Sequence, residues 1–249
     1  MMIGAWLRFF RVVNLPTVPG DVWVGAVAFW YGAETIVDYG AALFNATVAS
    51  VFVYLFGLAD NDIVGAKTDV GRPIPNGQIS LRAARIARAL CLAAVVAVGF
   101  APDPVALRPL PPLWWFAVTS LALAVLVYNR TKSWALMGLC RGLNVVCGGA
   151  VAWGSLATYS EVGDMSASIG LLAAVATVWT VYVAVVTKYS EGEELDPERK
   201  RRVGFLVGAI VYLQIIALLA FQSGIVVLVG VLLVVLRLLK RHLPGVSAS

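Results

Sequence analysis

The residues best suited to chemistry lie in one polar stretch, residues 60–80, which reads DNDIVGAKTDVGRPIPNGQIS between two long apolar runs. It carries three carboxylates, Asp60, Asp62 and Asp69. If the chain stays helical there, Asp62 and Asp69 lie on one helix face about 10 Å apart. That spacing is too long for one ion but suits two cations bridged by a diphosphate. Since Mg²⁺ is held by one or two carboxylates plus substrate phosphates, we expect a phosphorylated substrate here.

A second acidic segment, residues 188–202, reads KYSEGEELDPERKRR and follows about 130 residues later. Both segments follow an even-numbered apolar run, so we expect them on the same membrane face, with Glu191 completing a magnesium site. An alternative is open for Asp196, which precedes Pro197 in the order typical of a helix N-cap and first helical residue. Glu193, Glu194 and Glu198 are alternatively a solvated face that pairs with the basic residues 199–202.

Basic residues near these segments are predicted to neutralise phosphate oxygens, Arg through a bidentate fork and Lys as a point charge. They are Arg72, Lys132, Arg141 and Lys188. Metal and cations together favour departure of a diphosphate leaving group. Arg141 and Asn144 lie within an apolar run, where polar side chains are costly and indicate function.

The elements that position these residues are predicted to be membrane-spanning helices. Apolar residues make up 60% of the chain, against roughly 45–50% in soluble domains. They form runs of about 17–22 residues, long enough to cross the hydrocarbon core as helix. We predict an all-α bundle of about eight spans, arranged as two four-helix halves in one domain, residues 1–249. The expected spans are Val18–Tyr31, Ala41–Leu58, Ala83–Phe100, Pro112–Tyr128, Trp134–Leu156, Ser168–Val186, Val203–Phe221 and Gly224–Leu239. The first of them is expected to begin earlier, nearer Arg11, because Pro16 and Pro19 suit a helix start or a kink.

The distribution of charge predicts the orientation. Nearly all Lys and Arg fall in alternate loops, which places those loops, both acidic segments and both termini in the cytoplasm of a cell (plasma or inner) membrane protein. The net charge of +5 is explained by this topology, so nucleic-acid binding is not expected. The cysteines, Cys91, Cys140 and Cys147, lie in apolar runs and read as core residues. The only histidine, His242, lies in a basic tail, so histidine catalysis is not expected.

The stretch NDIVGAKTD followed by GRPIPNGQIS resembles the first signature of the UbiA superfamily of intramembrane prenyltransferases. Asn61 and Asp62 match its Asn-Asp pair, and Asp69 matches its last aspartate. The trailing element is matched by Arg72, Pro73, Gly77 and Ser80. Three other stretches look similar: RVVNLPTVPG, YNRTK at 128–132, and MGLCRGLNVVCGG at 137–149, the last most similar to the EboC-like branch.

The resemblance implies Mg²⁺-dependent transfer of a prenyl group from a prenyl diphosphate to an aromatic or other lipophilic acceptor in the bilayer. The implied metal ligands are Asn61, Asp62, Asp69, Glu191 and Asp196. The implied catalytic residues are Asp62, Asp69, Arg72, Lys132 and Arg141. The implied substrate-binding residues are Asn14, Asn61, Tyr128, Asn144, Lys188 and Glu194.

The chain departs from the family pattern in both signatures. Gly65 stands where a middle aspartate is expected, and Leu195 stands where the second signature has its second aspartate. The linker from Asp69 to Arg72 is short, and eight spans are expected where the family usually has nine. Two other hypotheses therefore stay open: a catalytically inactive, lipid-binding relative, and a transporter of an anionic metabolite whose two halves form repeats.

Overall fold

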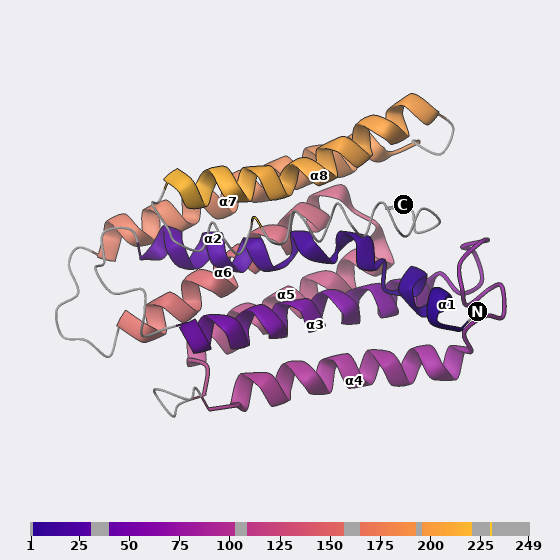
Figure 1. The fold of residues 1–249 in the computed structure, drawn as a ribbon, viewed down its shortest axis with the longest axis horizontal. Helices are drawn as coiled ribbons and strands as arrows, with labels where there is room; N and C mark the ends of the chain where they lie inside the picture. Colours follow the sequence, from indigo (N-terminus) through magenta and orange to yellow (C-terminus); the bar gives the residue numbers. More distant parts are fainter. Residues whose placement is uncertain are drawn as a thin grey trace.

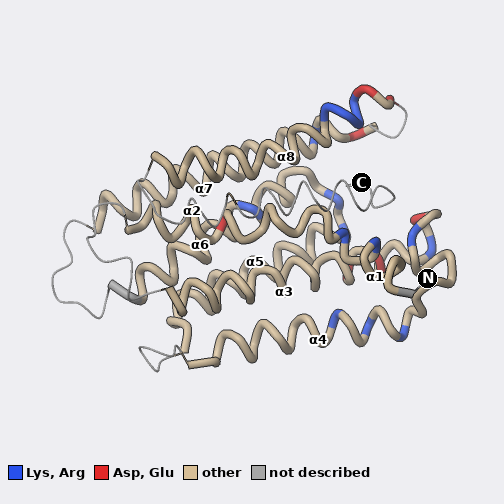
Figure 2. The backbone as a smooth tube through the Cα atoms, in the orientation of Figure 1, with Lys and Arg blue, Asp and Glu red and all other residues tan. Residues whose placement is uncertain are grey.

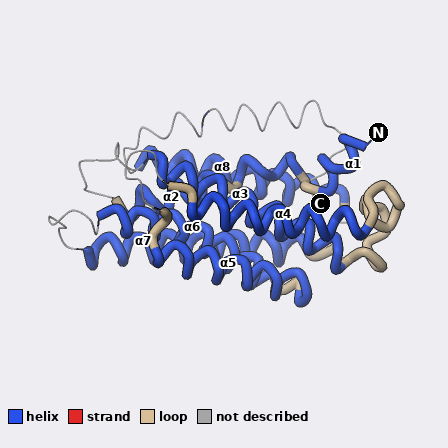
Figure 3. Tube along the Cα trace, turned by 90° about the horizontal axis from the view of Figure 1, so that it is seen from below, coloured by secondary structure: helices blue, strands red, loops and turns tan. Residues whose placement is uncertain are grey.

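The computed structural model describes residues 2–30, 40–102, 109–156, 165–192, 196–220 and 230, and its regular elements in these ranges are all helical (Figures 1 and 3). The elements are α1 (Met2–Phe9), the 3₁₀ helix η1 (Val12–Thr17), α2 (Pro19–Phe29), α3 (Gly40–Val64), α4 (Leu81–Phe100), α5 (Pro112–Thr131), α6 (Trp134–Leu156), α7 (Met165–Ser190) and α8 (Pro197–Ala220). The all-α prediction is confirmed.

Seven segments of the described chain are long and apolar enough to cross a membrane, and they correspond to the first seven expected spans. The first begins at Val12, which confirms the expected start nearer Arg11, because η1 runs into α2 and lengthens the apolar segment. The expected eighth span, residues 224–239, falls outside the described ranges, apart from Gly230. The division into two four-helix halves therefore stays a prediction.

The second span was predicted to end too early. It was expected to end at Leu58, but α3 continues to Val64, so Asn61 and Asp62 belong to its last turns. The helix ends there, and the chain then turns through residues 65–80 to α4. The Ser80 hydroxyl accepts a hydrogen bond from the backbone N–H of Ala83 at 3.1 Å, so Ser80 is the N-cap of α4.

Helix α6 occupies the centre of the bundle, where it contacts α2, α5 and α7. Its contact with α2 is a backbone contact: a Cβ added to Gly25 would overlap the carbonyl of Val145, and one added to Gly148 would overlap that of Val22. These glycines let α2 and α6 approach far more closely than larger residues allow. Most of α2 is buried as a result.

Lys and Arg gather at one end of the bundle, around α1, the segment after α3, the start of α4 and the start of α8 (Figure 2). The C-terminal end of α7 and the start of α8 lie at this same end (Figure 1). The two polar segments singled out in the sequence therefore share one end of the bundle. That this end faces the cytoplasm stays a prediction from the charge distribution.

Candidate active site

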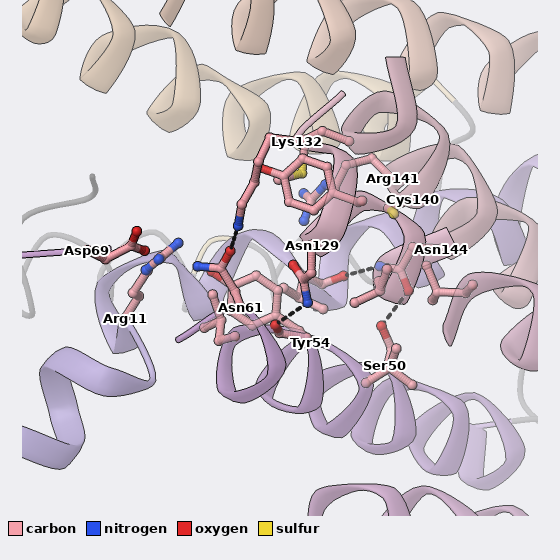
Figure 4. Close-up of a pocket in the computed structure, with 18 of the residues that line it drawn as sticks. Arg11, Ser50, Tyr54, Asn61, Asp69, Asn129, Lys132, Cys140, Arg141 and Asn144 are labelled. Carbon is pink, nitrogen blue, oxygen red and sulfur yellow. Dashed lines mark hydrogen bonds between the residues drawn. The ribbon is translucent and has the colours of Figure 1, made fainter. Parts of the chain in front are cut away.

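A cavity of about 310 Å³ opens among α3, α5, α6 and the segment that leads into α2. Apolar residues such as Val53, Leu121 and Val125 form its middle walls. Its polar lining comprises Arg11, Ser50, Tyr54, Asn61, Asp69, Arg72, Tyr128, Asn129, Lys132, Arg141 and Asn144 (Figure 4). The structure thus brings Asn61, Asp69, Arg72, Tyr128, Lys132, Arg141 and Asn144, all predicted from the sequence, to one cavity.

The charged end of this cavity, which we call the mouth, is lined by Asn61, Asp69, Arg72 and Lys132, and Asp62 follows Asn61 in α3. The Asn61 side-chain oxygen accepts a hydrogen bond from the Lys132 ammonium. Asp62 is buried and forms an ion pair with Arg11, with 3.5 Å between Oδ1 and Nη2. No group of the described chain donates a hydrogen bond to the buried Asp62 Oδ2. This buried oxygen is therefore unpartnered, and a bound cation or a donor that is not part of the protein would satisfy it.

Arg11 and Lys132 share an unusual backbone conformation. They are the two non-glycine residues of the described chain with positive φ, at 40° and 53°. Such conformations cost of order 1–3 kcal/mol and cluster at ligand sites. Here they direct two cationic side chains onto the Asn61–Asp62 pair from opposite segments. Burial lowers the pKa of the Lys132 ammonium, and the Asp69 carboxylate acts against that shift.

Asp69 reaches the mouth by folding back toward the end of α3. Its backbone N–H donates to the carbonyl of Gly65 at 2.9 Å, and the Thr68 hydroxyl donates to its carboxylate at 3.1 Å. A Cβ at position 65 would overlap the Asp69 carboxylate. The glycine that replaces the expected middle aspartate therefore leaves the space that the Asp69 carboxylate occupies.

The opposite end of the cavity, which we call the inner end, depends on a carboxylate that the sequence analysis did not single out. Asp21 in α2 is fully buried. Its carboxylate forms an ion pair with Arg141 at 2.9 Å. The same carboxylate accepts hydrogen bonds from Asn144 (3.1 Å), Trp179 (2.9 Å) and Gln214 (2.7 Å). This network fixes the positions of Arg141 and Asn144.

The other predicted residues lie elsewhere or outside the description. Glu191 is exposed and pairs with Lys188 at 2.7 Å. Asp196 caps α8 by accepting from the N–H groups of Glu198 (2.9 Å) and Arg199 (3.1 Å), which supports the N-cap reading. Asn14 lies in η1 and hydrogen-bonds Tyr54. Glu194 and Leu195 lie outside the described residues.

Across the described ranges, no three His, Cys, Asp or Glu side chains gather into a metal-binding group. Asp62, Asp69 and the Asn61 oxygen are nevertheless the kind of ligand that a hard cation binds. The unpartnered Asp62 oxygen would suit Mg²⁺, which takes its remaining ligands from phosphates or water. The structure does not bring Glu191 or Asp196 to these residues.

Several lining residues were missed in the sequence. Ser50, Tyr54 and Asn129 are single polar residues in apolar helices, and only packing shows that they face a common space. Asn129 also ties α5 to α3 through Asp60, donating to its carboxylate at 3.0 Å. Asp60 further binds Arg88 of α4 at 2.7 Å, so this first carboxylate of the polar stretch is structural.

No protein-family profile matches the sequence, and no curated protein matches it. Solved structures do match. A digeranylgeranylglyceryl phosphate synthase is 15% identical, with a TM-score of 0.56 over 99% of this chain and 92% of that chain. A UbiA homolog from Archaeoglobus fulgidus bound to GPP and Mg²⁺ is 15% identical, with a TM-score of 0.55 over 97% and 87% of the two chains. The same homolog bound to DMAPP and Mg²⁺ is 16% identical, with a TM-score of 0.53 over 96% and 87%.

These matches extend over nearly the whole chain and establish its class: a multi-pass membrane protein with the UbiA fold. The fold that the motifs at residues 61–80 implied is therefore confirmed.

Proposed function

We propose that this protein is a UbiA-superfamily prenyltransferase, which moves a prenyl group from a prenyl diphosphate to a lipophilic acceptor. One observation carries the proposal: the cavity joins a cationic mouth, which also holds Asn61 and Asp69, to apolar walls. An anionic head group and a hydrocarbon tail need these two environments side by side. The fold supports it, since the archaeal homolog was solved with GPP and with DMAPP.

At the mouth, the chain's own residues would bind and orient the diphosphate. Arg72 and Lys132 line the cavity and neutralise phosphate oxygens. Lys132 would exchange its bond to Asn61 for a bond to the substrate. A magnesium ion held by Asp62, Asp69 and Asn61 would supply further neutralisation of the leaving group. Participation of Glu191 would require it to leave Lys188.

The walls would protect the reacting carbon. When the C–O bond to the diphosphate breaks, its electron pair leaves with the diphosphate and positive charge develops on the allylic carbon. Val53, Leu121 and Val125 exclude water from that carbon. The Tyr128 ring, which already lies 5.9 Å from the Lys132 ammonium, offers a cation-stabilising face. The acceptor then donates an electron pair to the carbon and loses a proton to the released diphosphate.

The location of the reaction follows from the charge distribution. We propose that the mouth and both acidic segments face the cytoplasm of a cell membrane, and that the prenyl tail extends toward the lipid. Membership in the EboC-like branch rests on residues 137–149 alone and stays a prediction.

The test uses purified full-length protein in detergent, labelled geranyl diphosphate and a membrane-lipid extract as the source of acceptors. We expect release of diphosphate and formation of a labelled lipid, both reduced by EDTA and restored by Mg²⁺. Binding without turnover would overturn the enzyme and favour the inactive relative. Absence of binding, together with uptake of an anion into vesicles, would favour the transporter.

A further inference from the structure

The inner end of the cavity is polar although it lies well inside the bundle. Ser50 and Asn61 both lie on α3, eleven residues apart, which is about 16 Å along a helix. In Figure 4, Ser50 and Asn144 stand on the opposite side of the cavity from Arg11 and Asp69. A diphosphate bound at the mouth does not reach this far. A prenyl tail gains nothing from polar groups, and such groups are costly within a membrane span.

Hydrogen-bond accounting shows which atoms of the inner end are available to a ligand. Both N–H donors of Asn144 are used, since its NH₂ group donates to Val18 O at 3.2 Å and to Asp21 at 3.1 Å, and its oxygen accepts one bond, from the Ser50 hydroxyl. The Ser50 oxygen keeps its own lone pairs, because in this contact it acts only as a donor.

Arg141 supplies the complementary donor. Its Nη2 atom donates to Thr17 O at 2.7 Å and to Asp21 at 3.1 Å, and its Nε atom lies 2.9 Å from Asp21 as an ion pair without a hydrogen bond. Its Nη1 atom has only a long contact, 3.5 Å, with the Thr17 hydroxyl. Arg141 and Ser50 both line the cavity. The inner end therefore offers N–H donors beside a hydroxyl oxygen that can accept.

The charge of the inner end selects among ligands. Asp21 is fully buried and its negative charge is matched by Arg141, so the pair is neutral as a unit. A ligand carboxylate or phosphate would add an unmatched negative charge close to Asp21 in a low-dielectric site. An uncharged hydroxyl can accept from Arg141 and donate to Ser50 without that cost.

We infer that the inner end of the cavity binds the uncharged hydroxyl or phenol group of the acceptor substrate. The inference rests on the proposed function, since it assigns the second substrate of that reaction. In this arrangement Arg141 and Ser50 bind the acceptor, and Asp21 is a positioning residue that holds Arg141 and cancels its charge. Arg141 then serves the acceptor and leaves neutralisation of the diphosphate to the cations at the mouth.

The test compares two probes of the same shape, 4-heptylphenol and 4-heptylbenzoate, which are neutral and anionic at pH 7. Binding to the full-length protein in detergent is measured by calorimetry. We expect the phenol to bind about tenfold more tightly, because the benzoate adds an unmatched negative charge beside Asp21. Ser50→Ala should weaken phenol binding several-fold. Ser120→Ala is the matched control, because the Ser120 hydroxyl donates to Phe116 O in its own helix, and it should leave phenol binding unchanged.

Asp21→Asn gives a readout that a purely structural role would not produce. It leaves Arg141 unmatched, so the preference should shift from phenol toward benzoate while the amide keeps the shape of the side chain. Equal affinity for the two probes, or equal effects of Ser50→Ala and Ser120→Ala, would overturn the inference even if Asp21→Asn fails to fold. Binding of geranyl diphosphate is measured in a separate titration. Its failure to bind would contradict the proposed function, whereas the two phenol and benzoate affinities test the inner end alone.

Discussion

The acidic segment after α3 and the one between α7 and α8 look alike in the sequence but differ in their surroundings. In the first, Asp62 is buried with one oxygen unpartnered, and Asp69 lines the mouth. In the second, the described carboxylates Glu191, Asp196 and Glu198 are exposed and bound by their own segment. Carboxylates close in sequence are therefore insufficient for a site. Burial against a cavity is what separates the first segment from the second.

The strongest test of this comparison is removal of Asp62. Asp62→Ala should lower turnover of geranyl diphosphate about 10²- to 10³-fold, the size typical of lost electrostatic stabilisation of developing charge. The protein should still elute as a folded species, which size-exclusion chromatography checks. Turnover equal to that of the wild type would remove Asp62 from the site.

The next effect concerns the cation opposite Asn61. Lys132→Met should weaken binding of geranyl diphosphate about tenfold, because a charge-assisted hydrogen bond is lost. Lys67→Met is the matched control, since Lys67 is an exposed lysine of the same polar stretch. Similar losses in the two variants would show that only overall charge matters.

The same lysine gives a pH dependence. Burial lowers the pKa of Lys132, so its ammonium loses its proton at a lower pH than an ordinary lysine. Because the protonated form binds phosphate, affinity for geranyl diphosphate should fall as pH rises through that lowered pKa. In Lys132→Arg the guanidinium stays protonated, and the fall should disappear. Titrations of both proteins between pH 7 and about pH 10 check this; identical profiles would contradict it.

A smaller effect tests the glycine beside Asp69. Gly65→Ala places a methyl group where the Asp69 carboxylate lies, so the carboxylate must move. An off-rotamer shift costing about 1 kcal/mol corresponds to a roughly fivefold loss of turnover. Gly170→Ala is the control, because a Cβ there meets nothing within 4 Å. Full activity in Gly65→Ala would separate Asp69 from the reaction.

The smallest effect is expected in the second segment. Asp196→Ala removes the N-cap of α8 and should cost about 1 kcal/mol of stability, read as a lower melting temperature. Turnover should change by less than about twofold, because Asp196 caps α8 and does not line the cavity. A loss of turnover comparable to that of Asp62→Ala would instead support a metal site formed by both acidic segments.

The sequence was sufficient for the spans and for half of the site, for physical reasons that differ. Apolar runs and the Lys/Arg asymmetry report directly on the bilayer, so seven spans were found with errors at their ends, as at Leu58. Residues of the polar stretch, and Arg141 within its span, stood out by type. Ser50 and Arg11 did not, since their roles depend on which helices pack together. Asp21 did carry a signal, a carboxylate inside an apolar span.

The glycine contact between α2 and α6 has a mechanical consequence. Gly25 and Gly148 hold the two backbones against each other, so this seam has no side chains that can rotate aside to create a gap. Arg141 and Asn144 stand on α6, bonded across the seam to Asp21 on α2. We therefore expect little widening between α2 and α6, so that, under the proposed function, a prenyl tail would enter the cavity between other helices.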